Sequence, residues 1–149
     1  MPPSVPPSLD RIDHVHVYVA DRAAALPWYA SVLGFAPLPE LAFWAADGGP
    51  LTVSNRSGTI HLALFERGAH TCRSTIALAA DAAEFLAWRT HLEAVLGQPM
   101  AAVDHQVSWS MYFADPDANP FEITSDAYAV LAPLLGKAGG LRARAAGLI

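Results

Sequence analysis

Hydrophobic and polar side chains alternate over the first regular stretch of the chain, RIDHVHVYVA at residues 11–20. One face of this stretch would carry three valines, and the other face would carry His14, His16 and Tyr18. A period of two residues predicts a β-strand. We expect the valine face to pack against a helix, which leaves both histidines facing the space on the other side of the sheet.

A helix should follow this strand directly. Asp21 is typical of an N-cap, the alanine-rich segment up to Leu33 is predicted as the helix, and Gly34 would end it. Three further strands complete the first half of the chain in our interpretation. They are predicted around residues 41–45, at 51–54 and at 59–66, and the last of them puts His61, Ala63 and Phe65 on one face.

The same pattern restarts after a polar connector. A strand is predicted at residues 73–80, Asp81 is a second N-cap, and an amphipathic helix at 82–96 ends at Gly97. The remaining predicted elements are strands at 103–114 and 120–125 and a short helix at 126–135. Both halves of the chain therefore share one plan, which is a strand, a helix and three more strands.

A shift of 61 residues aligns the two halves of the sequence. The shift sets His14 against Thr75 on the first strand of each half, and His61 against Glu122 on the last strand. Glu122 lies between two apolar residues, where a carboxylate is costly unless it has a partner. Four positions related by a pseudo-twofold axis therefore combine two imidazoles, a hydroxyl and a carboxylate.

Composition narrows the functional classes. With 149 residues, 53% of them hydrophobic, the chain can bury a core, and its net charge of −5 offers no basic surface for nucleic acid or for an anionic membrane. Cys72 is the single cysteine, so the fold does not need an oxidising compartment, and a cytoplasmic location is expected. Residues 1–9 are rich in proline and serine and are expected to form a flexible arm.

Two stretches together with the repeat resemble the vicinal oxygen chelate superfamily, which includes glyoxalase I, extradiol dioxygenases and the bleomycin and fosfomycin resistance proteins. The stretches are IDHVHVYVADRAAALPWYASVLGF near the start and YFADPDANPFEITS near the end. The resemblance implies an α+β fold in which two tandem βαβββ modules, residues 10–67 and 72–126, form a cupped eight-stranded mixed sheet with helices outside. Residues 10–126 would be one domain, and residues 127–149 a C-terminal helix and tail.

In that superfamily a metal lies inside the cup, and its ligands come from the first and last strands of the modules. The resemblance therefore implies ligands at His14 and Glu122. Thr75 departs from the family pattern, because many members carry a histidine there. This departure either removes the metal or moves the third ligand to His61, with His16 as the competing choice and otherwise a substrate-binding residue.

Two imidazoles and one carboxylate suit Fe(II) or Mn(II), and the same ligand types also suit Zn(II) or Ni(II). A cation would also balance the charge of a buried Glu122. In the alternative interpretation there is no metal: the histidine on the first strand is a hydrogen-bonded core residue, and Glu122 pairs with Arg56 or Arg73.

The stretch from His105 to Glu122 also resembles the extradiol ring-cleavage dioxygenase signature, with a histidine, a tyrosine, an Asp-Pro turn and a glutamate in matching order. In those enzymes the histidine is an acid/base near the oxygen site and the tyrosine contacts a substrate hydroxyl. The resemblance thus implies catalytic roles for His105 and Tyr112. Ala118 departs from the signature, which prefers glycine at this turn position. The structural alternative is a surface His105 and a Tyr112 at the edge of the core.

Trp44 and Trp109, both on predicted strands, are expected to form walls of a substrate pocket. The leading functional hypothesis is a small metal-dependent enzyme that binds vicinal oxygens of a small-molecule substrate, with a preference for extradiol-type chemistry. The alternatives are a glyoxalase-type isomerase or lyase, and a non-catalytic drug-binding protein like the bleomycin resistance members. The resemblance also implies that two chains pair as a homodimer.

Overall fold

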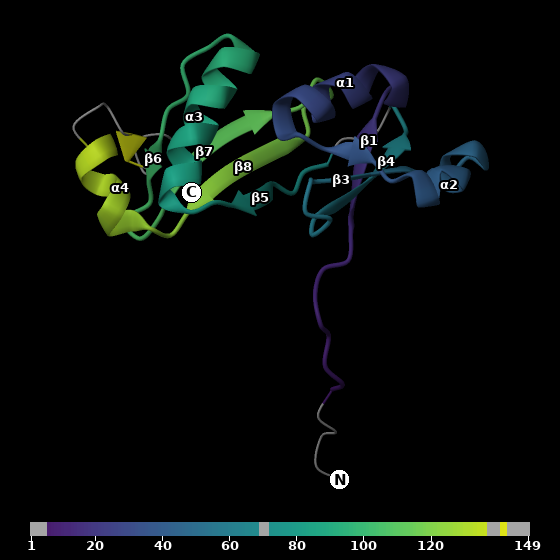
Figure 1. Ribbon diagram of the computed structural model, residues 1–149, viewed down its shortest axis with the longest axis horizontal. Coiled ribbons are helices and arrows are strands. Elements are labelled where there is room, and N and C mark those ends of the chain that lie inside the picture. Colours follow the sequence, from purple (N-terminus) through teal and green to yellow (C-terminus); the bar gives the residue numbers. More distant parts are fainter. Residues whose placement is uncertain (1–5, 69–71, 137–140, 143–149) are drawn as a thin grey trace.

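Two modules of similar topology follow one another along the chain, and each contains a strand, a helix and three further strands (Figure 1). The computed structural model describes residues 6–68 and 72–136, together with the backbone of residues 141–142. The α+β class and the two tandem modules predicted from the sequence are therefore confirmed.

The first module forms a four-stranded mixed sheet in the order β1-β4-β3-β2. Its elements are β1 (Val15–Val19), α1 (Arg22–Leu33), β2 (Ala36–Pro37), a 3₁₀ turn (Pro39–Leu41), α2 (Ala42–Ala46), β3 (Leu51–Ser54) and β4 (His61–Glu66). β1 pairs in parallel with β4, so the first and last strands of the module lie side by side. This register sets His16 opposite Ala63 and Tyr18 opposite Phe65.

The second module repeats this arrangement in a sheet of order β5-β8-β7-β6-β9. Its elements are β5 (Ile76–Ala79), α3 (Ala82–Leu96), β6 (Val103–Asp104), β7 (Trp109–Ala114), β8 (Pro120–Ser125), α4 (Tyr128–Leu135) and β9 (Leu141–Arg142). β5 pairs in parallel with β8, and Ala77 lies opposite Glu122. β9, which pairs with β6, was not predicted from the sequence.

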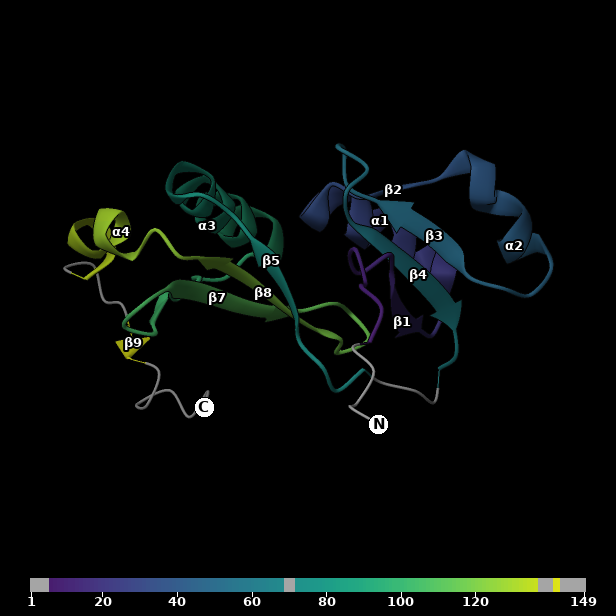
Figure 2. The ribbon, with the colours of Figure 1, turned by 90° about the horizontal axis from the view of Figure 1, so that it is seen from below.

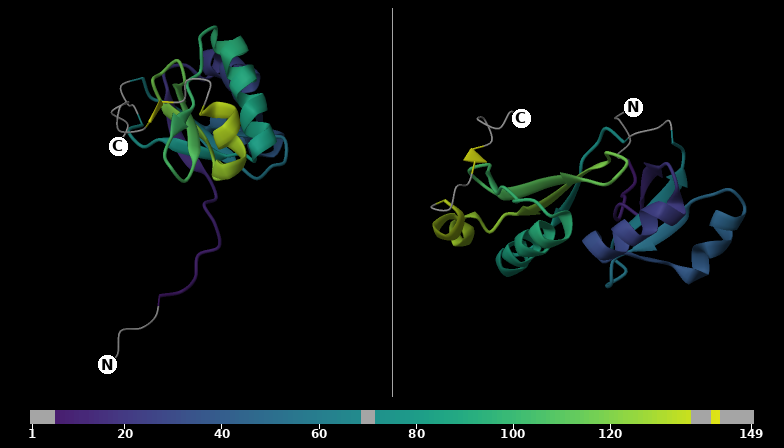
Figure 3. Two further views of the ribbon diagram at one scale, coloured as in Figure 1. Left: turned by 90° about the vertical axis from the view of Figure 1, so that its left-hand side faces the viewer. Right: turned by 90° about the horizontal axis from the view of Figure 1, so that it is seen from above.

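The nine described strands are divided between two sheets, four in the first module and five in the second. α1 and α3 lie next to each other on the same side of the two sheets (Figures 2 and 3). Within the described residues no hydrogen-bonded ladder joins β1 to β5. Each module therefore forms one half of the expected cup. The sheet face that carries no helix, which we call the open face, points away from α1 and α3.

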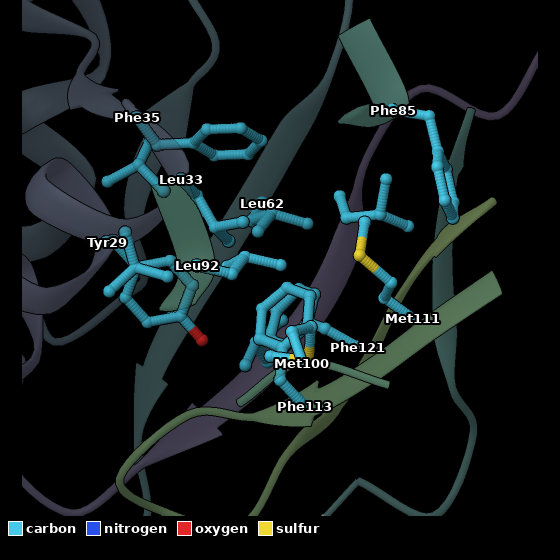
Figure 4. Packing of buried hydrophobic residues seen from close by; sticks show 14 of the residues in the cluster. Tyr29, Leu33, Phe35, Leu62, Phe85, Leu92, Met100, Met111, Phe113 and Phe121 are labelled. Atoms are coloured by element: carbon cyan, nitrogen blue, oxygen red, sulfur yellow. The ribbon is translucent and has the colours of Figure 1, made fainter. Parts of the chain in front are cut away.

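A single hydrophobic core runs through both modules beneath the helices (Figure 4). On β1 the valines that alternate with the histidines are buried, as the sequence pattern predicts, with Val17 at 0% and Val19 at 1% exposure. Trp28 on α1 packs its ring within 6.1 Å of Phe121 on β8, measured between centroids. Apolar packing between α1 and the second sheet thus holds the two modules together.

The strand predicted around residues 41–45 is wrong. These residues belong to the 3₁₀ turn and to α2 instead. Pro39, at the first position of the 3₁₀ turn, has a backbone angle fixed near the helical value, and alanines favour helix over strand. The Arg22 guanidinium donates hydrogen bonds to the carbonyls of Ala45 and Gly49, which fixes the end of this helical segment against α1.

Residues 6–14 are exposed and have no regular secondary structure, and the first of them run away from the rest of the chain as an arm (Figure 1). Most of the expected arm and tail, residues 1–5 and the side chains beyond 136, lies outside the described residues. α4 confirms the short helix expected at residues 126–135. None of the helices in the described part of the chain has the length and apolarity needed to cross a membrane.

Candidate functional site

Three histidines gather at the open face of the first module. His14 comes just before β1 and His16 lies on it, with both side chains on the same side of the strand. Both line a hollow of about 620 Å³ together with His61 at the start of β4. The parallel pairing of β1 and β4 causes this meeting, because it brings residues 47 positions apart in the sequence to neighbouring places in the sheet. The structure therefore brings together the histidines that the repeat singled out.

His14 and His16 are hydrogen-bonded to each other through their ring nitrogens. The two Nε2 atoms are 3.1 Å apart, and His14 Nδ1 lies 2.8 Å from Asp13 Oδ2. The hydrogen bond from His14 is the main reason why the pKa of Asp13 lies below its usual value. Asp13 therefore orients the His14 ring through Nδ1, and Nε2 of the ring faces His16.

A second polar group lies on the open face of the other module. Ser110 Oγ donates to Glu122 Oε1 at 2.6 Å, and the Tyr112 hydroxyl donates to the same oxygen at 3.3 Å. His105 Nε2 lies 2.8 Å from the Tyr112 hydroxyl oxygen, to which it donates. The antiparallel register of β7 and β8 explains the group, since Tyr112 is directly opposite Glu122.

Burial raises the pKa of the Tyr112 hydroxyl, and the nearby Glu122 charge raises it further. The phenol therefore stays protonated at neutral pH and acts as a hydrogen-bond donor. His105 is the member of this chain of hydrogen bonds that carries an imidazole, a side chain suited to general acid–base chemistry. Ser110 was missed by the sequence analysis, although it lies two residues before Tyr112 and thus on the same face of the strand.

The two groups do not meet within one chain. Glu122 is half-buried on β8, and it does not line the hollow that holds His14 and His61. In the described part of the chain there is no set of three or more histidine, cysteine, aspartate or glutamate side chains placed to hold a metal ion. Thr75 does line the hollow opposite the histidines, so the position where many relatives carry a histidine contributes only a hydroxyl.

The donor types nevertheless fit a divalent metal. His14 and His61 bring two imidazoles to the same hollow, and a carboxylate on the other module would supply the negative charge. The hydrogen-bond partners of Glu122 are the hydroxyls of Ser110 and Tyr112, rather than Arg56 or Arg73. Among the described residues, however, one chain presents two half-sites and no assembled ligand set.

The two tryptophans lie away from both half-sites. Trp44 is on α2 and is 44% exposed, and it lines none of the hollows at the open faces. Trp109 is 2% exposed and stacks on Tyr128 of α4, with ring centroids 5.6 Å apart. Trp109 alternates along β7 with Ser110 and Tyr112, so its side chain packs on one face of the sheet while theirs lie on the opposite face with Glu122.

Comparison with known proteins gives one family and several similar folds. The family model described as "Glyoxalase/Bleomycin resistance protein/Dioxygenase superfamily" matches residues 11–123. An integron cassette protein from the mobile metagenome of the Halifax Harbour sewage outfall has a TM-score of 0.65 at 18% identity, covering 78% of this chain and 99% of that one. No curated protein matches the sequence significantly.

Two further solved structures carry descriptive names. A glyoxalase/dioxygenase from Nostoc punctiforme has a TM-score of 0.57 at 22% identity, with 83% of this chain and 99% of that chain covered. The fosfomycin resistance protein FosX from Mesorhizobium loti has a TM-score of 0.55 at 19% identity, with 79% and 93% covered. At these identities the similarity shows the fold alone, whereas the family model spans most of the sequence. The chain therefore belongs to the glyoxalase/bleomycin resistance protein/dioxygenase superfamily.

Proposed function

We propose that the chain is a small metal-dependent enzyme that acts on a substrate with vicinal oxygens, with chemistry of the extradiol-dioxygenase type. The observation that carries this proposal is the run of hydrogen bonds from His105 through Tyr112 to Glu122. It contains an imidazole that can exchange a proton, a phenol that stays protonated, and a carboxylate that orients the phenol. Such a set is suited to proton transfer at a substrate hydroxyl on the open face of the sheet.

The residues of this chain would divide the work as follows. His105 takes the proton from a substrate hydroxyl. When the substrate binds, the Tyr112 hydroxyl turns its single proton from Glu122 to the substrate oxygen and holds that oxygen in place. Ser110 Oγ, 2.6 Å from Glu122 Oε1, fixes the carboxylate in one orientation. Because the pKa of Tyr112 is raised, its role is to orient and donate, and the role of base falls to His105.

His14, His61 and Glu122 are the residues that would hold the metal, and Fe(II) or Mn(II) fits two imidazoles and a carboxylate better than Zn(II) or Ni(II). A bound metal would supply Lewis acidity and open positions for the vicinal oxygens of the substrate. Since one chain keeps His14 and His61 apart from Glu122, we infer a homodimer. In this dimer the first module of one copy faces the second module of the other, and each of the two sites takes ligands from both copies.

The test is metal content followed by turnover. Protein purified without chelators should retain a divalent metal, and an anaerobic sample loaded with Fe(II) and mixed with catechols and oxygen should form a yellow ring-fission product. Turnover of a hemithioacetal in place of catechol would favour the glyoxalase-type isomerase. Protein that neither retains nor binds Fe(II), Mn(II), Ni(II) or Zn(II) would overturn the enzyme proposal.

One observation favours a second candidate, a drug-binding protein without catalysis. The described residues of a single chain hold no assembled group of three metal ligands. The hollow of about 620 Å³, which residues of both modules line, is large enough for a small molecule without any metal. A monomer that binds a small drug-like compound and no metal would support this candidate over the enzyme.

A further inference from the structure

A second hollow, of about 330 Å³, lies on the open face of the first module. Its lining consists of His16, Tyr18, Phe65 and Arg67. His16 also lines the larger hollow that contains His14 and His61, so the two hollows adjoin. The lining of the smaller one combines three aromatic rings with one guanidinium, and we call it the aryl hollow.

The rings of the aryl hollow are arranged around Phe65. The His16 ring is 4.7 Å from the Phe65 ring at an angle of 54°, and the Tyr18 ring is 6.1 Å away at 49°, measured between centroids. The short side chain of Ala63 lies opposite His16 in the ladder, which leaves room between the larger side chains. Tilted rings around a gap form walls on which a planar aromatic ligand can pack edge-to-face or offset.

Arg67 places a positive charge at the end of this aromatic surface. Its guanidinium carbon lies 5.8 Å from the Phe65 ring centroid, and its backbone N–H donates to Val19 O at 2.9 Å just beyond the end of β4. This cation–π contact holds the side chain over the hollow. In the part of the chain that the structure describes, no ion pair involves Arg67.

The carboxylates at this end of the sheet are engaged elsewhere. Glu66 Oε2 accepts from the Arg22 backbone N–H at 3.1 Å and lies 3.6 Å from the Arg22 guanidinium. Asp117 Oδ1 accepts from the Ala20 N–H at 3.1 Å. The Arg67 guanidinium therefore remains available for a carboxylate from outside the chain, which its planar fork can bind through two parallel hydrogen bonds.

We propose that the aryl hollow binds an aryl carboxylate, with the aromatic ring against Phe65 and His16 and the carboxylate on Arg67. Successive same-face positions along a strand are about 6.6 Å apart. A ligand in the aryl hollow would therefore lie one or two such steps from His14. If its carboxylate is on Arg67, oxygens at the other end of its ring would reach the larger hollow. The idea that this ligand is the substrate rests on the proposed function. The preference of the aryl hollow for an aryl anion does not depend on it.

The experiment uses full-length protein treated with chelator, so that no divalent metal contributes. Benzoate, cyclohexanecarboxylate and benzyl alcohol are titrated separately by calorimetry and by amide chemical shifts in NMR spectra. Benzoate should bind about 10-fold more tightly than either analogue, since only benzoate has both the ring and the charge. The amides that shift should be those of residues 16–18 and 63–67.

Variants separate the two contributions. Arg67→Gln should weaken benzoate binding about 10-fold and leave benzyl alcohol unchanged, and Phe65→Leu should remove the preference for benzoate over cyclohexanecarboxylate. The matched control is Arg56→Gln, an exposed arginine in the loop between β3 and β4, which should leave both affinities unchanged.

Any of three results would overturn the proposal that the aryl hollow binds an aryl carboxylate. They are no binding of benzoate, equal affinity for benzoate and cyclohexanecarboxylate, and an unchanged benzoate affinity in a folded Arg67→Gln variant. Circular dichroism and thermal unfolding establish that each variant is folded. Because these measurements need neither metal nor turnover, a failed ring-cleavage assay would count against the proposed function and leave this result unaffected.

Discussion

Tyr29 on α1 and Asp115 in the turn before β8 are joined across the two modules by a buried hydrogen bond, with the hydroxyl donating to Oδ2 at 2.7 Å. Asp115 also accepts from the backbone N–H groups of Asp117 and Asn119 and from the Asn119 side-chain amide. Asn119 in turn donates to Tyr18 O at 2.8 Å. One turn of the second module is therefore held against both the helix and the first strand of the first module.

Replacing Tyr29 with phenylalanine should destabilise the fold. Tyr29 is 0% exposed, and the variant loses one hydrogen bond to a buried carboxylate while keeping the ring in the core. We expect a loss of about 1.5–3 kcal/mol in the free energy of unfolding, as measured by urea denaturation. Ser31→Ala, an exposed change on the same helix, is the control and should stay within about 0.5 kcal/mol of the wild type. An equally small effect for Tyr29→Phe would mean that the hydrogen bond does not stabilise the junction.

The same hydrogen bond predicts a loss of stability in alkaline solution. Burial is the main cause that raises the pKa of the Tyr29 hydroxyl well above its usual value, and the hydrogen bond to Asp115 raises it further. A group whose pKa is higher in the folded state contributes stability below its unfolded pKa and loses it as the pH rises. Above about pH 10 the wild type should lose roughly 1.4 kcal/mol per pH unit more than Tyr29→Phe. Parallel urea midpoints for the two proteins between pH 8 and pH 11 would contradict this prediction.

Complementation between two inactive variants tests the proposed dimer. His14→Ala and Glu122→Gln should each be inactive, because each removes a proposed ligand from both sites of its own dimer. If the sites are shared, a mixed dimer contains one site with both changes and one intact site. Random exchange in an equimolar mixture should therefore restore about a quarter of wild-type turnover. A mixture that stays inactive although mass measurements show mixed dimers would contradict shared sites.

His105→Gln tests the role of the imidazole as a base. Glutamine can still donate a hydrogen bond to the Tyr112 hydroxyl, which His105 does at 2.8 Å, but it cannot accept a proton at neutral pH. We expect kcat to fall by roughly 10²-fold with little change in KM, together with loss of the acidic limb of the pH–rate profile. Unchanged kcat, or an effect confined to KM, would assign His105 a structural role.

Local features of the fold could be predicted from the sequence, because neighbouring residues determine them. Asp21 and Asp81 cap their helices, accepting from the backbone N–H groups of Ala24 and Glu84 at 3.0 and 2.9 Å. Gly34 and Gly97 end the same helices with φ angles of 68° and 67°, where a residue without a Cβ is favoured. The alternation of residues along β1 was likewise enough to predict that its histidines share one face of the strand.

Features that depend on distant contacts could not be predicted in this way. Alternation places Trp109 on one face of β7 and Ser110 on the other, but only the packing of α4 shows that the tryptophan lies on the side away from Glu122. The repeat aligned His14 with Thr75 and His61 with Glu122, yet the distances between these side chains depend on how the two modules pack. That packing is fixed by contacts such as the bond between Tyr29 and Asp115, whose partners are 86 residues apart.

Ala118 offers a stabilising change at the turn that carries Asp115. Its φ angle is 62°, in the left-handed region that costs a residue with a Cβ roughly 1–2 kcal/mol relative to glycine. Part of this gain is offset because glycine loses more backbone entropy on folding. Ala118→Gly should therefore raise the free energy of unfolding by about 0.5–1 kcal/mol in urea denaturation. Ala23→Gly on the exposed side of α1 is the matched control and should lower it by about 1 kcal/mol. If both changes destabilise the protein equally, the left-handed conformation of Ala118 does not limit stability.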